Sequence, residues 1–220
     1  MKTNFISFAF LIVACINLSS CSKDDAEPIP TLDKSSITLY VDETSTLTYS
    51  GAECKWSTDN YLIAEVNNGK ITAKHVGTTI IHANNLTCTV IVKPRYNTYI
   101  EPYQNFGCSK TEVKNKMSAY NIKSDNGTTI VYYGKGKIDQ YGYTFENDKL
   151  KSSSFYTTLD NSVELAEFML ERYWVIETEK TGNNSYYFSF GSVDLKTVAF
   201  MQLNSSGAIV MYRSTEDGTN

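Results

Sequence analysis

Hydrophobic and polar residues alternate in short runs along the segment 32–94, as half-buried β-strands do. Ile37, Leu39 and Val41 would lie on one side of such a strand. Turn residues separate the runs, and Asn68-Gly69 suits a tight turn between two strands because both residues tolerate positive φ. The pattern predicts an all-β sandwich over 32–94.

A different pattern follows a linker at 95–104, where Tyr96, Tyr99 and Tyr103 lie close to Pro94 and Pro102. Ser109-x-x-Glu112 and Asn161-x-x-Glu164 each predict the start of a helix, the first as a capping box. Strands are expected at 128–133, 137–146, 149–157, 173–179, 185–190, 196–203 and 207–213. Short turns between consecutive strands favour an antiparallel sheet with both helices on one face. We therefore expect an α+β domain over 105–214, in which a helix-plus-strands unit is weakly repeated, and a polar tail at 215–220.

The N-terminus has the features of an export signal. Lys2 precedes a mostly apolar run at 5–16, which is too short to span the hydrocarbon core of a membrane. The run ends in Leu18-Ser19-Ser20-Cys21, which resembles a bacterial lipobox. The resemblance implies a signal peptide over 1–20, lipidation of Cys21 and an acylated tether over 21–31, so the chain would be anchored to a membrane and would not span it.

The residues after this cysteine suggest a cellular location for the protein. Ser22-Lys23-Asp24-Asp25 is similar to the acidic export signal of Bacteroidota surface lipoproteins. The resemblance implies an outer-membrane lipoprotein displayed on the cell surface. An anchor that faces the periplasm is the alternative.

Motifs within 32–94 point to a family. Lys55-Trp56-Ser57, Asn68-Gly69-Lys70-Ile71 and Gly77-Thr78-Thr79-Ile80 occur in the order of group 2 bacterial immunoglobulin-like domains, to which this segment is similar. The resemblance implies a compact β-sandwich with Trp56 in its core, of the kind that serves as a stalk, spacer or adhesive tip. The second domain carries no family motif. Its expected element order is somewhat like that of beta-lactamase inhibitory proteins and of small lipoproteins that assemble outer-membrane proteins.

Composition narrows the range of partners. The formal net charge of −4 argues against nucleic acid, because nucleic-acid binding requires a basic surface.

Cys54 and Cys88 share strand parity with core residues, so they should face the interior, either as a disulfide or as two free thiols. Cys108 stands at a helix start, where the helix dipole would lower its pKa, but neither histidine lies in the second domain to act as its base.

No set of catalytic residues, metal cluster or phosphate loop is recognised in the sequence. His75 and His82 have no third ligand at a suitable spacing, and Gly134-Lys135-Gly136-Lys137 lacks the ending of a P-loop. We expect no metal, no cofactor and no enzymatic activity.

Tyrosines are the most distinctive residues of the second domain. Such rings supply rigid contact area at protein interfaces and can stack on sugars, although they can equally pack beneath the helices. The candidate ligand-binding rings are Tyr141, Tyr143, Tyr186 and Tyr187. The leading hypothesis is a non-catalytic surface lipoprotein whose sandwich acts as a spacer and whose second domain binds a protein or a glycan. The alternatives are a periplasm-facing inhibitor or envelope-assembly accessory, and an unrecognised hydrolase.

Overall fold

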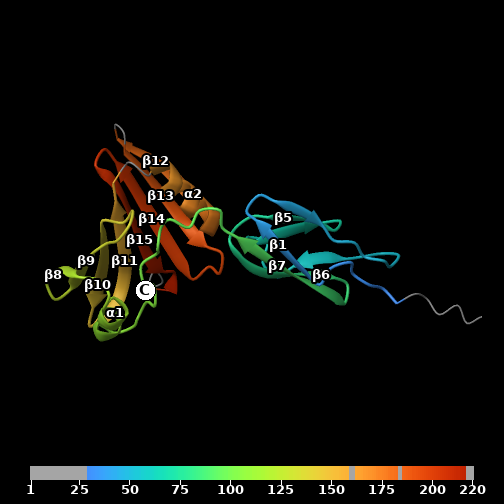
Figure 1. Ribbon diagram of the computed structural model, residues 1–220, viewed down its shortest axis with the longest axis horizontal. Helices are drawn as coiled ribbons and strands as arrows, with labels where there is room; N and C mark the ends of the chain where they lie inside the picture. Colours follow the sequence, from blue (N-terminus) through green and yellow to red (C-terminus); the bar gives the residue numbers. More distant parts are fainter. Residues whose placement is uncertain (1–28, 159–161, 183–184, 217–220) are drawn as a thin grey trace, which may run out of the picture.

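The computed structural model describes residues 29–158, 162–182 and 185–216. The expected signal peptide, the lipidation site Cys21 and most of the tether therefore lie outside the described residues. The described chain forms a smaller unit and a larger unit, which lie end to end (Figure 1). The first described segment, blue in Figure 1, lies at the end of the smaller unit that is remote from the larger one.

The smaller unit consists of seven strands in two sheets, with strand orders β1-β7-β6-β3 and β2-β5-β4. The strands are β1 (Ser36–Tyr40), β2 (Thr44–Thr46), β3 (Trp56–Thr58), β4 (Ala64–Asn67), β5 (Lys70–Ala73), β6 (Gly77–Ala83) and β7 (Leu86–Lys93). Strand β1 runs parallel to β7, and the other pairs are antiparallel. As the alternation predicts, Ile37, Leu39 and Val41 are buried in a core that also contains Ile71 and Val90.

The larger unit is built on one eight-stranded antiparallel sheet, here called the large sheet, with strand order β12-β13-β14-β15-β11-β10-β9-β8. Its strands are β8 (Ile122–Asp125), β9 (Thr129–Tyr133), β10 (Gln140–Glu146), β11 (Lys149–Thr157), β12 (Tyr173–Gly182), β13 (Ser185–Ser192), β14 (Thr197–Asn204) and β15 (Gly207–Ser214). Each half of the sheet is a meander of consecutive strands, and the two halves meet where β11 pairs with β15.

Two helices, α1 (Lys110–Lys116) and α2 (Ser162–Arg172), cover one face of the large sheet. The Ser109 side chain caps α1 by accepting the Glu112 N–H at 3.2 Å, as the sequence predicts. Val113 from α1 and Phe168 from α2 belong to the same hydrophobic core as the inward-facing residues of the sheet. We call the covered side the inner face and the opposite side the outer face.

The predicted fold class, an all-β sandwich followed by an α+β domain, is wrong because the described part of the chain is mostly β. Strands hold 53% of the described residues and helices only 10%. The helices have 7 and 11 residues, and part of the inner face is covered instead by the linker, through Tyr99 and Tyr103. Strand β8 was not predicted, since all four of its residues are exposed and show no alternation.

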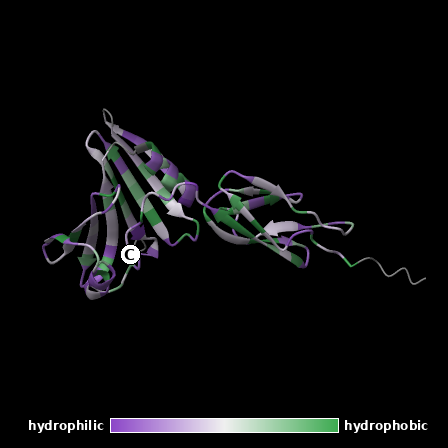
Figure 2. Ribbon diagram, viewed as in Figure 1, coloured by the Kyte–Doolittle hydropathy of each residue, from purple (hydrophilic) through white to green (hydrophobic). Residues whose placement is uncertain are grey.

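The strands of both units carry hydrophobic as well as hydrophilic residues. Figure 2 shows hydrophobic and hydrophilic residues interspersed along the strands of both units. Among the described residues, no helix is long and apolar enough to cross a membrane.

The two units meet through direct hydrogen bonds. The Asn60 side chain donates to the carbonyl of Val193 at 2.8 Å, and the Val76 N–H donates to the carbonyl of Glu171 at 2.7 Å. The Glu171 carboxylate also accepts the N–H of Arg95 at 2.9 Å. The turn between β13 and β14 is thus bound directly to the smaller unit, and α2 is bound to both the smaller unit and the linker.

Candidate binding surface

Two of the four candidate tyrosines lie in the core. Tyr141 and Tyr143 are 2% and 0% exposed and point to the inner face, beneath the helices. Burial raises the pKa of both phenols, and the Tyr143 hydroxyl donates to Met117 Sδ at 3.1 Å. A ligand cannot reach either ring, so their prediction as binding residues is wrong; the helices cover their side of the strand.

The other two candidates, Tyr186 and Tyr187, are neighbours on β13 and therefore point to opposite faces. Tyr186 lies on the inner side, with its ring 6.5 Å from that of Phe188. Tyr187 lies on the outer face, where its ring centroid is 5.9 Å from that of Phe200 and the two planes differ by 25°. Of the four predicted rings, Tyr187 belongs to the outer face.

Strand register defines the outer face residue by residue, because directly opposite residues on neighbouring strands share a face. One row across the sheet is Trp174, Gly191, Val198, Arg213, Ser152 and Thr144. The next row is Glu177, Ser189, Phe200, Met211, Ser154 and Gly142. A third row is Glu179, Tyr187, Gln202, Ile209, Tyr156 and Gln140.

Four large side chains, Trp174, Tyr187, Phe200 and Met211, form what we call the aromatic patch. They are all half-buried, and none of them belongs to either hydrophobic core. The Trp174 indole lies over Gly191, where a Cβ atom would come within 2.5 Å of Trp174 Nε1. A glycine opposite the tryptophan thus lets the indole lie against the sheet.

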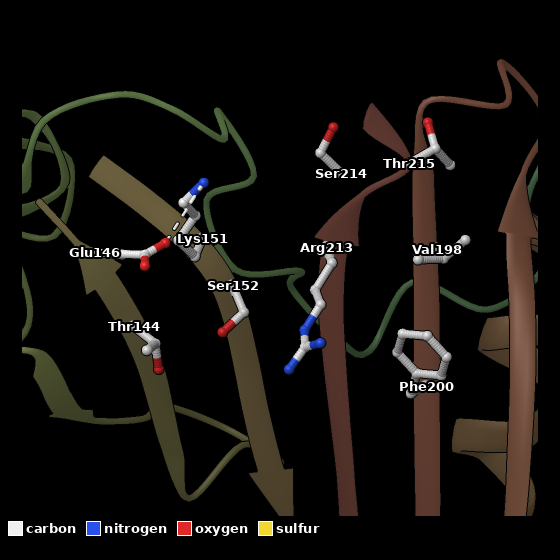
Figure 3. Close-up of a pocket in the computed structure, with 9 residues that line it drawn as sticks. All are labelled: Thr144, Glu146, Lys151, Ser152, Val198, Phe200, Arg213, Ser214 and Thr215. Carbon is white, nitrogen blue, oxygen red and sulfur yellow. Dashed lines mark ion pairs between the residues drawn. The ribbon is translucent and has the colours of Figure 1, made fainter. Parts of the chain in front are cut away.

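A groove adjoins the aromatic patch on the outer face (Figure 3). It encloses about 530 Å³ and crosses strands β10, β11, β15 and β14. Its lining includes Thr144, Ser152, Val198, Phe200, Arg213 and Ser214. Figure 3 shows the Arg213 guanidinium between Ser152 and the Phe200 ring.

Charged side chains surround these central residues. Glu146 and Lys151 form an ion pair of 3.9 Å at the rim of the groove. Glu177 and Glu179 are exposed on β12, at the opposite edge of the sheet. Burial raises the pKa of the Tyr187 phenol, the Glu177 charge adds to the rise and the Arg213 charge opposes it. The outer face thus carries acids along β12 and a cation in the groove.

The three described cysteines are free thiols. Cys88 is fully buried and Cys54 half-buried, so the structure has the two-thiol alternative and not the disulfide. Burial raises the pKa of the Cys108 thiol, contrary to the lowering expected from a helix start. Cys108 therefore lacks the low pKa of an activated nucleophile.

The two histidines are engaged in local hydrogen bonds. His82 Nε2 lies 2.7 Å from a carboxylate oxygen of Asp59, and His75 Nδ1 lies 2.5 Å from the carbonyl of Leu62. Within the described ranges, no three His, Cys, Asp or Glu residues are grouped so that they could hold a metal ion.

Trp174, Phe200 and Arg213 lie on the outer face but were not among the binding residues predicted from the sequence. A signal for Phe200 was available, because large apolar residues occupy both parities of β14: Phe200 on one side and Met201 on the other. A strand with one solvated face should carry mainly polar residues there. A strand that is apolar on both sides therefore indicates a second surface that needs a partner.

Comparisons with protein-family models, with curated proteins and with solved structures find no match. The function is therefore inferred from the chemistry of the outer face and from the anchor that the N-terminal sequence predicts.

Proposed function

We propose that this chain is a non-catalytic lipoprotein that binds a protein partner on the outer face of its large sheet. The smaller unit, a spacer of the immunoglobulin-like type, separates this face from a lipid anchor on Cys21. The observation that carries the proposal is the aromatic patch, whose large side chains remain half-exposed beside the Arg213 groove.

The residue types of the outer face support a protein partner. Tyrosine, tryptophan, phenylalanine, methionine and arginine are enriched in the centres of protein interfaces, whereas charged residues other than arginine concentrate at the rim. The aromatic patch and Arg213 supply these five types, and Glu146, Lys151, Glu177 and Glu179 lie around them. Met211 and Ile209 add aliphatic area that favours a protein over a glycan, because sugar hydroxyls would lose hydration against it without gaining a hydrogen bond.

The arrangement of the units supports the role of a spacer. The described chain begins at the end of the smaller unit remote from the large sheet (Figure 1). An anchor that precedes residue 29 would therefore lie on the far side of the smaller unit from the binding face. Hydrogen bonds at the junction would hold that face away from the membrane.

Photo-crosslinking in living cells tests the proposal. Gln202 lies exposed in the third row of the outer face, next to Tyr187 in the strand register. A photoreactive residue at this position should give a discrete protein adduct. Phe200→Ala in the same chain should reduce the adduct, since truncation of a central interface aromatic typically costs about 2 kcal/mol or more of binding free energy.

Thr78 provides the matched control, because it is exposed on β6 in the smaller unit. The same photoreactive residue there should give no adduct of that size. Equal adducts from Thr78 and Gln202, or an adduct that persists undiminished in a folded Phe200→Ala chain, would count against the outer face as the binding surface.

Antibody labelling of intact cells, with a protease-shaving control, tests the location. Strong labelling without permeabilisation is expected for surface display. Labelling that requires permeabilisation would place the binding face in the periplasm and would support the inhibitor or assembly role instead.

A further inference from the structure

The groove on the outer face contains a cation without a carboxylate partner among the described residues. Arg213 has one hydrogen-bond contact there, a long one of 3.8 Å from Nη2 to Met211 Sδ. The other two charged residues of the lining, Glu146 and Lys151, pair with each other. Among the described lining residues of the groove, the positive charges therefore exceed the negative ones by one.

Polar groups in the groove suit an oxyanion. Ser152 lies directly opposite Arg213 in the register, and Thr144 lies directly opposite Ser152. Within the described part of the chain, neither hydroxyl has a hydrogen-bond partner. Both can donate to a negatively charged oxygen placed beside the guanidinium, whose planar fork matches the two oxygens of a carboxylate.

One wall of the groove is apolar. The Phe200 ring and the Val198 side chain line the side that adjoins the aromatic patch. A ligand that places an oxyanion at Arg213 therefore brings its neighbouring groups against an apolar wall. An acidic side chain next to an aromatic or aliphatic one has this combination.

We propose that the groove receives an aspartate or glutamate of the partner protein, bound through the Arg213 guanidinium, with an adjacent apolar side chain packed on Phe200. This inference rests on the proposed function and specifies the chemistry of the partner. Charge also sets the orientation, because Glu177 and Glu179 at the β12 edge would repel a second acidic group. The partner therefore presents its acidic residue to the groove and a neutral or basic surface to β12.

Capped peptides test the inference on the full chain in detergent. The probes are fluorescent Ala-Phe-Asp-Ala and its Asn and Lys analogues, acetylated and amidated so that the side chain carries the only difference in charge. The Asp peptide should bind about threefold more tightly than the Asn peptide at low salt, because Arg213 is exposed and solvent screens part of the ion pair. The Lys peptide should not bind.

Two variants locate the effect. Arg213→Gln should abolish the preference for Asp over Asn, whereas Lys93→Gln, which removes an exposed cation at the end of β7, should leave it unchanged. Equal binding of the Asp and Asn peptides, or a preference that survives Arg213→Gln, would overturn the inference. Tighter binding of free glucuronate than of the Asp peptide would also overturn it, since the occupant would then be an acidic sugar.

The outcomes separate this inference from the proposed function. If the Asp preference is absent but the adduct at Gln202 still forms and still depends on Phe200, the partner is a protein and the carboxylate site is wrong. If the peptide preference and the adduct are both absent, both proposals fail.

Discussion

At the scale of single residues, Glu171 links the larger unit to the linker and to the smaller unit. Its side chain is nearly fully buried and accepts the backbone N–H groups of Arg95, at 2.9 Å, and Tyr96, at 3.0 Å. Its own carbonyl accepts the N–H of Val76 at 2.7 Å. One residue of α2 thus holds the linker with its side chain and the smaller unit with its backbone.

Removal of this carboxylate should destabilise the protein. In Glu171→Ala, two partly buried N–H groups would lose a charged acceptor, and we expect the free energy of unfolding to fall by about 2 kcal/mol. Urea denaturation followed by tryptophan fluorescence measures the loss. Glu167→Ala, one turn earlier and only half-buried, is the control and should change stability by about 0.5 kcal/mol or less. Similar losses in the two variants would refute this role of Glu171.

Glu101 is an acid whose folded environment favours the protonated form. Burial raises the pKa of its carboxyl, although the Tyr173 hydroxyl, which donates to Glu101 Oε1 at 2.6 Å, opposes the rise. A folded-state pKa above the unfolded value means that the folded chain binds the proton more tightly. The stability from this proton is complete below the unfolded pKa and is lost as the pH rises through the folded pKa.

Glu101→Gln should therefore change the pH dependence of stability. The glutamine stays neutral and keeps an oxygen that can accept from Tyr173. Relative to the wild type, the variant should gain stability as the pH rises from about 4, the ordinary pKa of glutamate, through the raised pKa of Glu101 in the folded state. Urea titrations at several pH values would show this, and a stability difference independent of pH would contradict the assignment.

At the scale of strands, β12 and β13 pack closely because residue 191 is a glycine. The Trp174 indole occupies the space that a side chain at Gly191 would need. Gly191→Ala should cost about 1–3 kcal/mol, the usual penalty for overpacking. The same substitution in a Trp174→Ala chain should cost less, because the clash is gone.

A double-mutant cycle measured by thermal or urea unfolding gives this coupling directly. Gly182→Ala on β12 is the control, since the nearest atom to its added Cβ would be 4.0 Å away. If Gly191→Ala is equally costly with and without Trp174, the indole is not the cause of the penalty.

For the molecule as a whole, the proposed spacer role depends on the predicted lipidation of Cys21, which lies outside the described residues. Cys21→Ala should abolish incorporation of labelled palmitate, because the thiol that carries the lipid is absent. A Cys21→Ala chain that still takes up palmitate would disprove lipidation at this residue.

Local signals along the chain were sufficient to find most strands and the start of α1; Asn161, the predicted start of the second helix, lies outside the described residues. The expected strand 149–157 coincides with β11, and the Ser109 cap forms as expected. The Glu112 side chain, expected to complete the capping box, instead accepts from the Tyr103 hydroxyl at 2.6 Å. Alternation and capping depend on residues a few positions apart, so sequence reveals them; the contact with the linker depends on long-range packing.

The covered face of each strand could not be read from the chain alone. Alternation places Tyr143 and Thr144 on opposite sides of β10, but it is the packing of α1 that buries the tyrosine side. In the same way, sequence marks Arg213 as an ordinary surface cation. Its position in a groove beside Phe200 follows from the pairing of β15 with β14 and β11, strands that come together only when the sheet forms. The spacing of hydrophobic positions and the helix caps depend on residues close together in the sequence. A binding surface depends on strands that are distant in the sequence and come together only in the folded sheet.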